Sequence, residues 1–456
     1  MKISFINPSM TGERTRDRFE PLTFAALAGA TPAGVERVLF DECLRPIPVE
    51  EPTDLAAISV STMTARRAYQ LAAQYHRRGV PVVLGGYQPT LFPQEALRFA
   101  DAIIIGEAER VWPRVVEDFR TGRPQRVYRE PCLSLEGLRY DRTIFAGKRY
   151  QPIRLVQFGR GCLYDCDFCV IPRFFEKRWT HRPVGEVADE VGGLGRAHIF
   201  FVDDNLYAGH DAFRELLAAL TPLRVRWTCQ ASLDIASDPE LVRRMAQAGC
   251  FSVLIGFESL AQDTLTRMNK GWHRGRSQYE DAVRRLDGEG ILVYGTFVLG
   301  YDEDSPGIID ACLEFAERSR LFLAAFNLLM PLPGTGVYQR LLDQGRLIGD
   351  PWWLDPATRF CKPVFEPLGM TSEELRQGAH RIRSRFYGLP GILTRALKTP
   401  SVRSSLWRFP LYLAANLVYR REVRRLDERP YGDPGDPNEL VGFAADLRHP
   451  VPPGAE

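Results

Sequence analysis

The sequence lacks most of the features that mark membrane, secreted or nucleic-acid-binding proteins. No apolar run approaches the roughly 20 residues that a membrane span requires. The N-terminal stretch MKISFINPSM lacks the cationic and apolar segments of a signal peptide. A formal net charge of +2 over 456 residues argues against a surface that binds nucleic acid through bulk charge. We therefore expect a cytoplasmic protein with no membrane span and no nucleic-acid partner.

Cysteine is also sparse, since nine residues in a chain of this length do not make a disulfide scaffold. Three of them, Cys162, Cys166 and Cys169, lie within eight residues in the stretch FGRGCLYDCDFCVIPRFF. Thiolates this close together indicate metal ligands in a reducing compartment. The other six are scattered and behave as small hydrophobic residues: Cys43, Cys132, Cys229, Cys250, Cys312 and Cys361.

Residues 1–130 alternate apolar runs with helical patterns, which predicts βαβ units and a doubly wound, Rossmann-like α/β sheet. Ligands of such sheets bind at the carboxyl ends of the strands. Small and polar residues recur there, and a Gly-Gly pair would let a large planar ligand approach the backbone, although turn chemistry alone also explains single glycines. The candidate ligand-binding residues are Asn7, Pro8, Ser9, Ser61, Thr62, Gly85, Gly86, Gly106 and Glu107.

A second series of β/α units follows an expected linker at residues 131–150. Six units over residues 151–347 are too few for a closed eight-fold barrel and predict an open, partial (β/α)6 barrel. Residues 348–430 predict a helical C-terminal region, with helices around 372–386 and 405–425. The tail at 431–456 is rich in Pro, Gly and Asp and is expected to be disordered.

The cysteine spacing is CxxxCxxC, with the aromatic Phe168 directly before the third cysteine. One interpretation is a zinc site completed by His181, but closed zinc sites typically combine a CxxC pair with a second, distant pair. The other is a cubane iron–sulfur cluster, which takes four protein ligands when it only transfers electrons. With three ligands, one iron stays open for a substrate.

The CxxxCxxC motif at the end of the first strand of a six-fold β/α barrel resembles the radical S-adenosylmethionine (radical SAM) enzymes. The resemblance implies a [4Fe–4S] cluster held by Cys162, Cys166 and Cys169, whose open iron binds S-adenosylmethionine (SAM). Reductive cleavage of SAM would yield a 5′-deoxyadenosyl radical that abstracts hydrogen from an unactivated carbon. We assign no catalytic side chain beyond these cluster ligands.

The same resemblance implies a set of SAM-binding residues at the strand ends. Asp203, Asp204 and Asn205 stand where the family commonly has Gly-Gly-Glu, although an Asp pair there also suits a helix cap. The remaining positions correspond to segments near the ribose and the adenine, and ordinary strand-end packing is their alternative. The full set is Phe168, Asp203, Asp204, Asn205, Gln230, Ser232, Gly256, Glu258 and Met330.

The α/β domain in front of the barrel resembles the cobalamin (B12)-binding domain of cobalamin-dependent radical SAM enzymes. The nine strand-end residues named above would then contact cobalamin. The DxHxxG motif, whose His coordinates cobalt in many corrinoid enzymes, is absent. Asp41, Glu42 and Cys43 follow the second strand, and the first histidine, His76, falls inside a helix. The resemblance therefore implies cobalamin without a His lower ligand.

The expected activity is methylation of an unactivated carbon of a small-molecule biosynthetic intermediate, a natural product or a lipid, through the 5′-deoxyadenosyl radical and methylcobalamin. An electron donor such as flavodoxin or ferredoxin would be the protein partner. One alternative is a radical SAM enzyme that cyclises, rearranges or oxidises its substrate without methyl transfer. Others are a methylthiotransferase, which would need three N-terminal cysteines where only Cys43 and Cys132 occur, and a non-catalytic corrinoid or iron–sulfur sensor.

Overall fold

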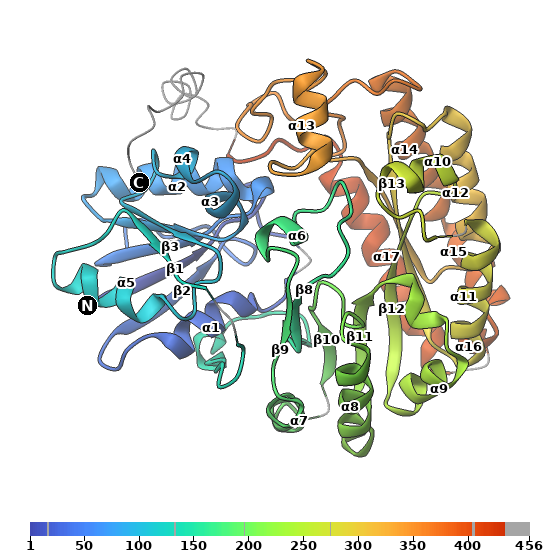
Figure 1. The fold of residues 1–456 in the computed structure, drawn as a ribbon, viewed down its shortest axis with the longest axis horizontal. Helices are drawn as coiled ribbons and strands as arrows, with labels where there is room; N and C mark the ends of the chain where they lie inside the picture. The colour runs from blue at the N-terminus through green and yellow to red at the C-terminus, as the bar shows by residue number, and fades with distance from the viewer. Residues whose placement is uncertain (16–17, 132–133, 196, 274, 404–405, 434–456) are drawn as a thin grey trace. The chain divides into compact units, whose positions relative to one another are not determined.

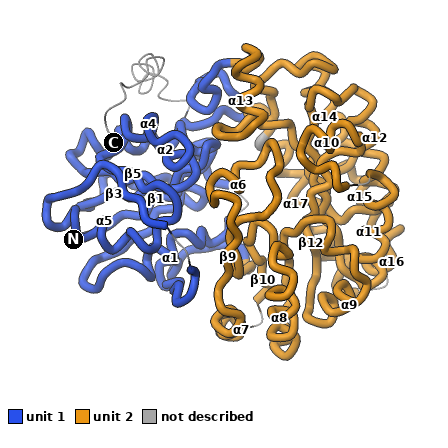
Figure 2. The backbone as a smooth tube through the Cα atoms, viewed as in Figure 1, with its two compact units in different colours: residues 1–151, 349–359, 429–456 blue, residues 152–348, 360–428 orange. Residues whose placement is uncertain are grey.

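The computed structural model describes residues 1–433 except 16–17, 132–133, 196, 274 and 404–405. The described residues form two compact units (Figure 2). Unit 1 comprises residues 1–151, 349–359 and those from 429 onward, and unit 2 comprises residues 152–348 and 360–428. From residue 434 on, the tail expected to be disordered lies outside the described residues.

Unit 1 is a parallel sheet with helices on its faces (Figure 1). Its strand order is β2-β1-β3-β4-β5-β6, which is the flavodoxin-like order with its switch point between β1 and β3. The strands are β1 (Lys2–Asn7), β2 (Glu36–Asp41), β3 (Leu55–Ser59), β4 (Val82–Gly85), β5 (Ala102–Ile105) and β6 (Val127–Arg129). The helices are α1 (Leu22–Ala30), α2 (Ala65–Arg77), α3 (Tyr87–Leu91), α4 (Pro93–Ala96) and α5 (Trp112–Arg120).

Two local features of unit 1 differ from the sequence pattern. The stretch PTLFPQEALRFA (89–100) has a helical pattern, but the structure breaks it between α3 and α4 at Phe92, whose φ of −132° and ψ of 64° are not helical. The cause is Pro93, since the ring of a proline disfavours helical geometry in the residue before it. The three-residue strand β6 was also missed, because a strand this short gives no periodic signal.

Two segments outside residues 1–130 also belong to unit 1. In the segment expected as a linker, Ile144 and Phe145 are buried, and the Tyr150 hydroxyl donates to Asp41 at 2.8 Å. In the segment 349–359, Trp353 is buried and donates its indole N–H to the Glu95 carboxylate at 2.9 Å. These contacts join residues more than 100 positions apart, which local sequence patterns do not reveal.

Unit 2 contains an open six-stranded parallel sheet in the order β14-β13-β12-β11-β10-β7. Each strand pairs with the next in the chain, as in a barrel that does not close, so the predicted α/β fold class with a partial (β/α)6 barrel is confirmed. The strands are β7 (Ile153–Val156), β10 (His198–Phe201), β11 (Arg226–Ala231), β12 (Cys250–Glu258), β13 (Leu292–Leu299) and β14 (Leu323–Leu328), and a separate antiparallel pair is β8 (Gly159–Gly161) with β9 (Trp179–His181). The helices are α6 (Ile171–Phe174), α7 (Val184–Gly193), α8 (His210–Leu220), α9 (Pro239–Gln247), α10 (Gln262–Arg267), α11 (Arg276–Gly288), α12 (Pro306–Arg318), α13 (Gly336–Asp343), α14 (Ser372–Phe386), α15 (Leu389–Lys398), α16 (Pro400–Arg403) and α17 (Arg408–Leu426).

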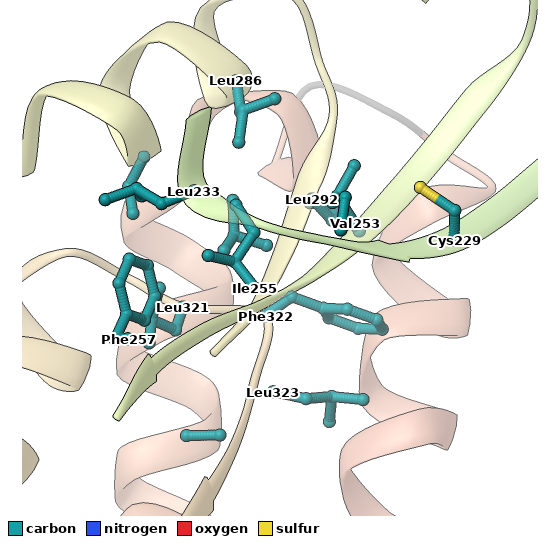
Figure 3. Close-up of a cluster of buried hydrophobic side chains, with 14 of the residues drawn as sticks. Cys229, Leu233, Val253, Ile255, Phe257, Leu286, Leu292, Leu321, Phe322 and Leu323 are labelled. Atoms are coloured by element: carbon teal, nitrogen blue, oxygen red, sulfur yellow. The ribbon is translucent and has the colours of Figure 1, made fainter. Parts of the chain in front are cut away.

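The core of unit 2 is built by alternation along its strands. On β12, Val253, Ile255 and Phe257 are fully buried among the hydrophobic side chains of neighbouring strands and helices (Figure 3). Burial of each such side chain contributes roughly 1.5–3 kcal/mol. Because side chains alternate across a sheet, Leu254 and Gly256 face the opposite side. That opposite side is where the cysteine loop lies.

The edge strand β14 is closed by side chains from the C-terminal helices. The Tyr387 hydroxyl donates to the carbonyl of Ala324 at 2.9 Å and accepts from its N–H at 3.2 Å. Arg383 donates to the carbonyl of Phe326 at 2.9 Å, and Asn416 donates to that of Phe322 at 3.2 Å. An uncovered edge would leave these groups open to pairing with another chain. The C-terminal helices thus cover this edge of the sheet.

Candidate functional site

The three clustered cysteines line one cavity of about 460 Å³ in unit 2. They lie in the loop between β8 and α6, where the N–H of Cys169 donates to the carbonyl of Cys166 at 3.1 Å. The loop starts at Gly161, which has a φ of +84°, and a Cβ there would lie 2.0 Å from the carbonyl oxygen of Arg178 on the opposite side of the hairpin. A glycine is therefore required to direct the chain into the cysteine loop.

Residues 153–161 form two strands, β7 and β8, rather than one continuous strand, because of Asp203. Its carboxylate accepts from the backbone N–H of Phe158 at 3.1 Å and from that of Gly159, which takes both groups out of the main sheet. Asp203 is 1% exposed, and burial raises the pKa of its carboxyl to about 7. Asp203 was expected to bind SAM, but it does not line the cavity. It lies behind the cavity wall, where its hydrogen bonds fix the backbone that leads to Cys162.

Burial makes the three thiols poor acids in the absence of a metal. It raises the pKa of Cys166 to about 11 and that of Cys169 to about 12, and it raises the pKa of Cys162 as well. Thiolates are nevertheless the metal-binding form. A cationic cluster would supply the charge that holds the sulfurs deprotonated. The three thiols would therefore lose their protons when the metal binds.

The described residues contain no group of three or more His, Cys, Asp or Glu arranged around a single ion. His181, which the zinc alternative requires, lies on β9 and does not line the cavity. Its Nδ1 is 2.9 Å from the carbonyl of Arg182, and its ring stacks on Trp179. In a cubane each thiolate binds a different iron, so the sulfurs stand further apart than the ligands of one ion. His181 is therefore not placed where the zinc alternative requires its fourth ligand.

Four of the expected SAM-binding residues form one polar wall of the cavity. Asp204 accepts from the N–H of Gly161 at 2.9 Å, and burial raises the pKa of its carboxyl. Gln230 donates to the Asp204 carbonyl at 2.9 Å, and Asn205 donates to the Ser232 hydroxyl at 3.1 Å. The side-chain N–H of Asn205 also lies 3.9 Å from the sulfur of Cys162. These strand ends are therefore linked directly to the cysteine loop.

Glu258 and Lys270 form a buried ion pair on the cavity wall, with Lys270 Nζ 2.8 Å from Glu258 Oε1. Glu258 has a φ of +64° at a bulge in β12, a left-handed conformation that a non-glycine residue adopts only when its surroundings hold it there. A Cβ at Gly256 would lie 2.1 Å from Glu258 Oε1, so the glycine makes room for this carboxylate. Burial is the largest single influence and lowers the pKa of Lys270, but the charge and hydrogen bond of Glu258 and the charges of the nearby cysteines together outweigh it, so the pKa is raised.

Several cavity residues were not identified from the sequence. Three of them face the cavity from alternate positions of β13: Tyr294, Thr296 and Val298. Their spacing of two residues is the sequence signal that could have placed them on one face of the strand. Lys270 and Trp272 lie in a loop after α10, where no pattern marks them. Of the other expected residues, Phe168 lines the cavity, whereas Met330 lies two residues beyond β14 and does not line it.

In unit 1, the nine expected cobalamin-binding residues all lie at the carboxyl ends of four strands, β1, β3, β4 and β5. They are Asn7, Pro8 and Ser9 after β1, Ser61 and Thr62 after β3, Gly85 and Gly86 at β4, and Gly106 and Glu107 after β5. A Cβ at Gly86 would lie 2.7 Å from the carbonyl oxygen of Val60, so this glycine is needed for packing. Gly106, with a φ of +81°, has open space where a Cβ would point.

The carboxylate of Glu42, which follows β2, and the ring of His76 both form hydrogen bonds within unit 1. Glu42 is 1% exposed and accepts two hydrogen bonds from Arg67, at 2.9 and 2.7 Å, and one from the N–H of Ser9 at 3.0 Å. His76 lies on α2 with its Nε2 2.9 Å from Asp101. These contacts give both groups roles within the fold.

Comparison with known proteins agrees with this geometry. Residues 156–314 match the family model of the Radical SAM superfamily. The chain is 29% identical over 359 residues to bacteriochlorophyllide d C-12(1)-methyltransferase of Chlorobaculum tepidum, which covers 76% of this chain and 77% of that protein. It is 24% identical over 438 residues to anaerobic magnesium-protoporphyrin IX monomethyl ester cyclase of Rubrivivax gelatinosus, which covers 85% of this chain and 77% of that protein.

Among solved structures, the radical S-adenosylmethionine methyltransferase TsrM from Kitasatospora setae, with cobalamin and a [4Fe–4S] cluster bound, superposes with a TM-score of 0.62. The match covers 82% of this chain and 81% of that chain at 17% identity, and it shows the shared fold.

The α/β unit and the partial barrel with its three-cysteine loop define the class of the protein, a radical SAM enzyme. The Radical SAM superfamily model matches residues 156–314, and the fold resembles that of a radical SAM methyltransferase whose solved structure contains cobalamin. The resemblance predicted from CxxxCxxC is thereby confirmed.

Proposed function

We propose that this chain is a cobalamin-dependent radical SAM enzyme that methylates an unactivated carbon of a small biosynthetic intermediate. The central observation is that three cysteines with no fourth cysteine in the loop line the same cavity as the strand-end residues of a radical SAM barrel. The matched relatives include a protein named as a methyltransferase, which supports methyl transfer over other radical reactions.

The cavity residues fit the group that the family implies. Cys162, Cys166 and Cys169 would hold a [4Fe–4S] cluster, and the polar wall offers carboxylate, amide and hydroxyl groups to SAM. Asp204 suits the methionyl ammonium, and Ser232 with Gln230 suits hydroxyl groups. When bound, the cluster supplies one electron for the cleavage of SAM, and cobalamin supplies a transferable methyl group.

The side chains themselves position the ligand and exclude water. The side-chain amide of Asn205 contacts both the Cys162 sulfur and the Ser232 hydroxyl, so it fixes the position of the cysteine loop relative to the polar wall. Tyr164 stacks on Trp272 with ring centroids 4.7 Å apart and donates to Asp234 at 3.0 Å, which places an aromatic pair beside the cysteine loop. A water-excluding site protects a radical from quenching by solvent.

Cobalamin would bind at the strand-end edge of unit 1. The open space at Gly106 suits close approach of a large planar ring, whereas the engagement of His76 with Asp101 supports a cobalt without a His ligand. The other wall of the barrel cavity, with Leu254, Tyr294 and Val298, suits an organic substrate with apolar parts. An electron donor such as a flavodoxin or ferredoxin would supply the reducing electrons.

Product stoichiometry tests the proposal. After anaerobic reconstitution with iron, sulfide and hydroxocobalamin, the purified protein should retain a corrinoid spectrum. It should also produce both 5′-deoxyadenosine and S-adenosylhomocysteine from SAM under reducing conditions. A Cys169→Ala variant should lose 5′-deoxyadenosine while remaining folded. If the corrinoid washes off completely, the cobalamin branch of the proposal fails.

A second candidate is a radical enzyme that cyclises or oxidises its substrate, which the match to a cyclase supports. The same measurement separates the two. One 5′-deoxyadenosine per turnover without S-adenosylhomocysteine would favour cyclisation or oxidation.

A further inference from the structure

The C-terminal helices of unit 2 expose an unusual number of large apolar side chains. In the part of the chain that the structure describes, eight of thirteen exposed large hydrophobic residues fall between positions 389 and 418. On α15, Leu389, Leu393 and Leu397 are spaced four residues apart, so they form one stripe, and they are 50%, 47% and 54% exposed. Ordinary surfaces expose such residues singly.

Helix α17 continues the apolar region. Leu411 and Val418 lie seven residues apart on one face, and Leu417 lies beside Val418; their exposed fractions are 42%, 36% and 36%. Helices α15, α16 and α17 contact one another, so their exposed side chains share one neighbourhood of unit 2 (Figure 1). We name residues 389–421 the C-terminal apolar-basic segment.

The charge of this segment is one-sided. Residues 389–421 contain no Asp or Glu and six Lys or Arg. Because the whole chain has a net charge of +2, the remainder of the chain carries a net charge of −4. Lys398, Arg403 and Arg421 are exposed and form no salt bridge with any other described residue. Arg421 lies three residues after Val418, on the same face of α17.

Trp407 stands at the start of α17, 40% exposed, with the Arg226 guanidinium 3.9 Å from its ring centroid. Tryptophan is enriched where a protein meets the interface of a bilayer, because its ring is apolar and its N–H is polar. No helix among the described residues is long and apolar enough to cross a membrane. Leucines and a tryptophan framed by unpaired cations are the composition of segments that lie in the plane of a lipid interface.

We propose that the C-terminal apolar-basic segment docks the enzyme on the surface of a bilayer that contains anionic lipids. The leucine stripe of α15 and the exposed face of α17 enter the headgroup region. Lys398, Arg403 and Arg421 attract the lipid phosphates. A second copy of the chain is the other conceivable occupant of the apolar stripe, but the exposed cations Lys398, Arg403 and Arg421 would repel those of another copy across such an interface.

Co-sedimentation of the full-length, cluster-loaded protein with vesicles tests this. Phosphatidylcholine vesicles with phosphatidylglycerol should bind the protein, and phosphatidylcholine alone should bind it much more weakly. A Leu393→Ser/Leu397→Ser variant and an Arg403→Gln/Arg421→Gln variant should each weaken binding at least about ten-fold. For the arginine variant the reason is that each cation near an anionic surface contributes about a five-fold factor. Leu368→Ser, which changes a leucine that is 69% exposed outside the segment, is the matched control and should bind normally.

Three outcomes would overturn the proposal. One is the absence of binding to either vesicle. Another is binding that is equal for neutral and anionic vesicles or unchanged in both double variants. The third is a dimer in solution that the leucine variant converts to monomer, which would assign the stripe to self-association. Formation of 5′-deoxyadenosine in detergent-free solution should be unchanged in all variants, so these results are independent of the proposed methyl transfer.

Discussion

The ammonium group of Lys270 lies 2.8 Å from Glu258 Oε1, and both side chains are about nine-tenths buried on the wall of the cavity that the cysteines line. Lys270 also lies 3.3 Å from the carbonyl oxygen of Gly256. Glu258 is held in a left-handed conformation, and Gly256 has no side chain to obstruct it. Two residues of a strained strand end, Gly256 and Glu258, are therefore organised around the Lys270 cation beside the proposed cluster.

Replacing Lys270 with Met should destabilise the protein by roughly 3–5 kcal/mol, because it leaves the Glu258 carboxylate buried without its partner. Denaturant unfolding monitored by circular dichroism measures this. The matched control is Arg267→Gln, which breaks the ion pair of Arg267 with Glu303 at 2.9 Å. Because Arg267 is half exposed, we expect a loss of about 0–1 kcal/mol. Equal small losses for both variants would contradict a structural role for the buried pair.

Replacing Gly161 with Ala should prevent cluster assembly. The new Cβ would lie 2.0 Å from a backbone carbonyl oxygen at a φ of +84°, so the hairpin before Cys162 must rearrange. Iron and sulfide content after reconstitution measures the effect, and we expect it to fall to a small fraction of the wild-type value. Gly185→Ala, in the first turn of α7 with open space around it, is the control and should retain full iron content.

Replacing Tyr387 with Phe should cost about 1–3 kcal/mol, because the N–H and carbonyl of Ala324 on the edge strand would be left buried without a partner. The control is Tyr301→Phe. Tyr301 is 1% exposed, and its hydroxyl has no hydrogen-bond partner among the described residues, so its removal should be neutral or stabilising. Thermal or chemical unfolding of the two variants should therefore differ in sign or clearly in size.

Asp304 should make stability depend on pH. Burial raises the pKa of this carboxyl to about 6, although the N–H groups of Gly300 and Tyr301 and the Thr264 hydroxyl stabilise its charged form. The unfolded chain loses this proton near pH 4 while the folded protein keeps it up to about pH 6. The folded state therefore binds more protons in this window, and this contribution to stability falls as pH rises from about 4 to about 6.

Replacing Asp304 with Asn removes that titration. The free energy of unfolding of the wild type relative to Asp304→Asn should decrease by up to about 3 kcal/mol between pH 4 and pH 6, and it should be constant above pH 7. Urea titrations at a series of pH values measure the difference. A difference that does not change with pH would contradict the raised pKa.

Much of the architecture followed from local patterns. Apolar runs separated by helices predicted both parallel sheets, because a strand buried on two faces must be apolar throughout, as β3 and β5 are. A helix was expected around 372–386, and the structure has it at these bounds, with Thr371 and Glu374 forming a capping box at its start. Features with no periodic signal, such as β6, were missed, and so was helix α15, which lies between the two C-terminal helices that were expected.

The candidate site likewise contains residues that local sequence placed and residues that only distant contacts placed. Cys162, Cys166 and Cys169 were predicted to share one site because they are local in sequence, and the structure places all three on one cavity. Asp203 was expected among the cavity residues, yet its hydrogen bonds to Phe158 and Gly159, about 45 positions away, place it behind the wall.

What the sequence determined by itself is the order of the α/β unit and the partial barrel and the grouping of three cysteines in one loop, since periodicity and motif spacing are properties of neighbouring residues. The tertiary structure alone decided that Lys270 meets Glu258, that residues 349–359 return to unit 1, and that the C-terminal helices close the edge of β14. Each of these depends on which distant segments pack together, and that choice is made by burial and hydrogen-bond satisfaction over the whole chain.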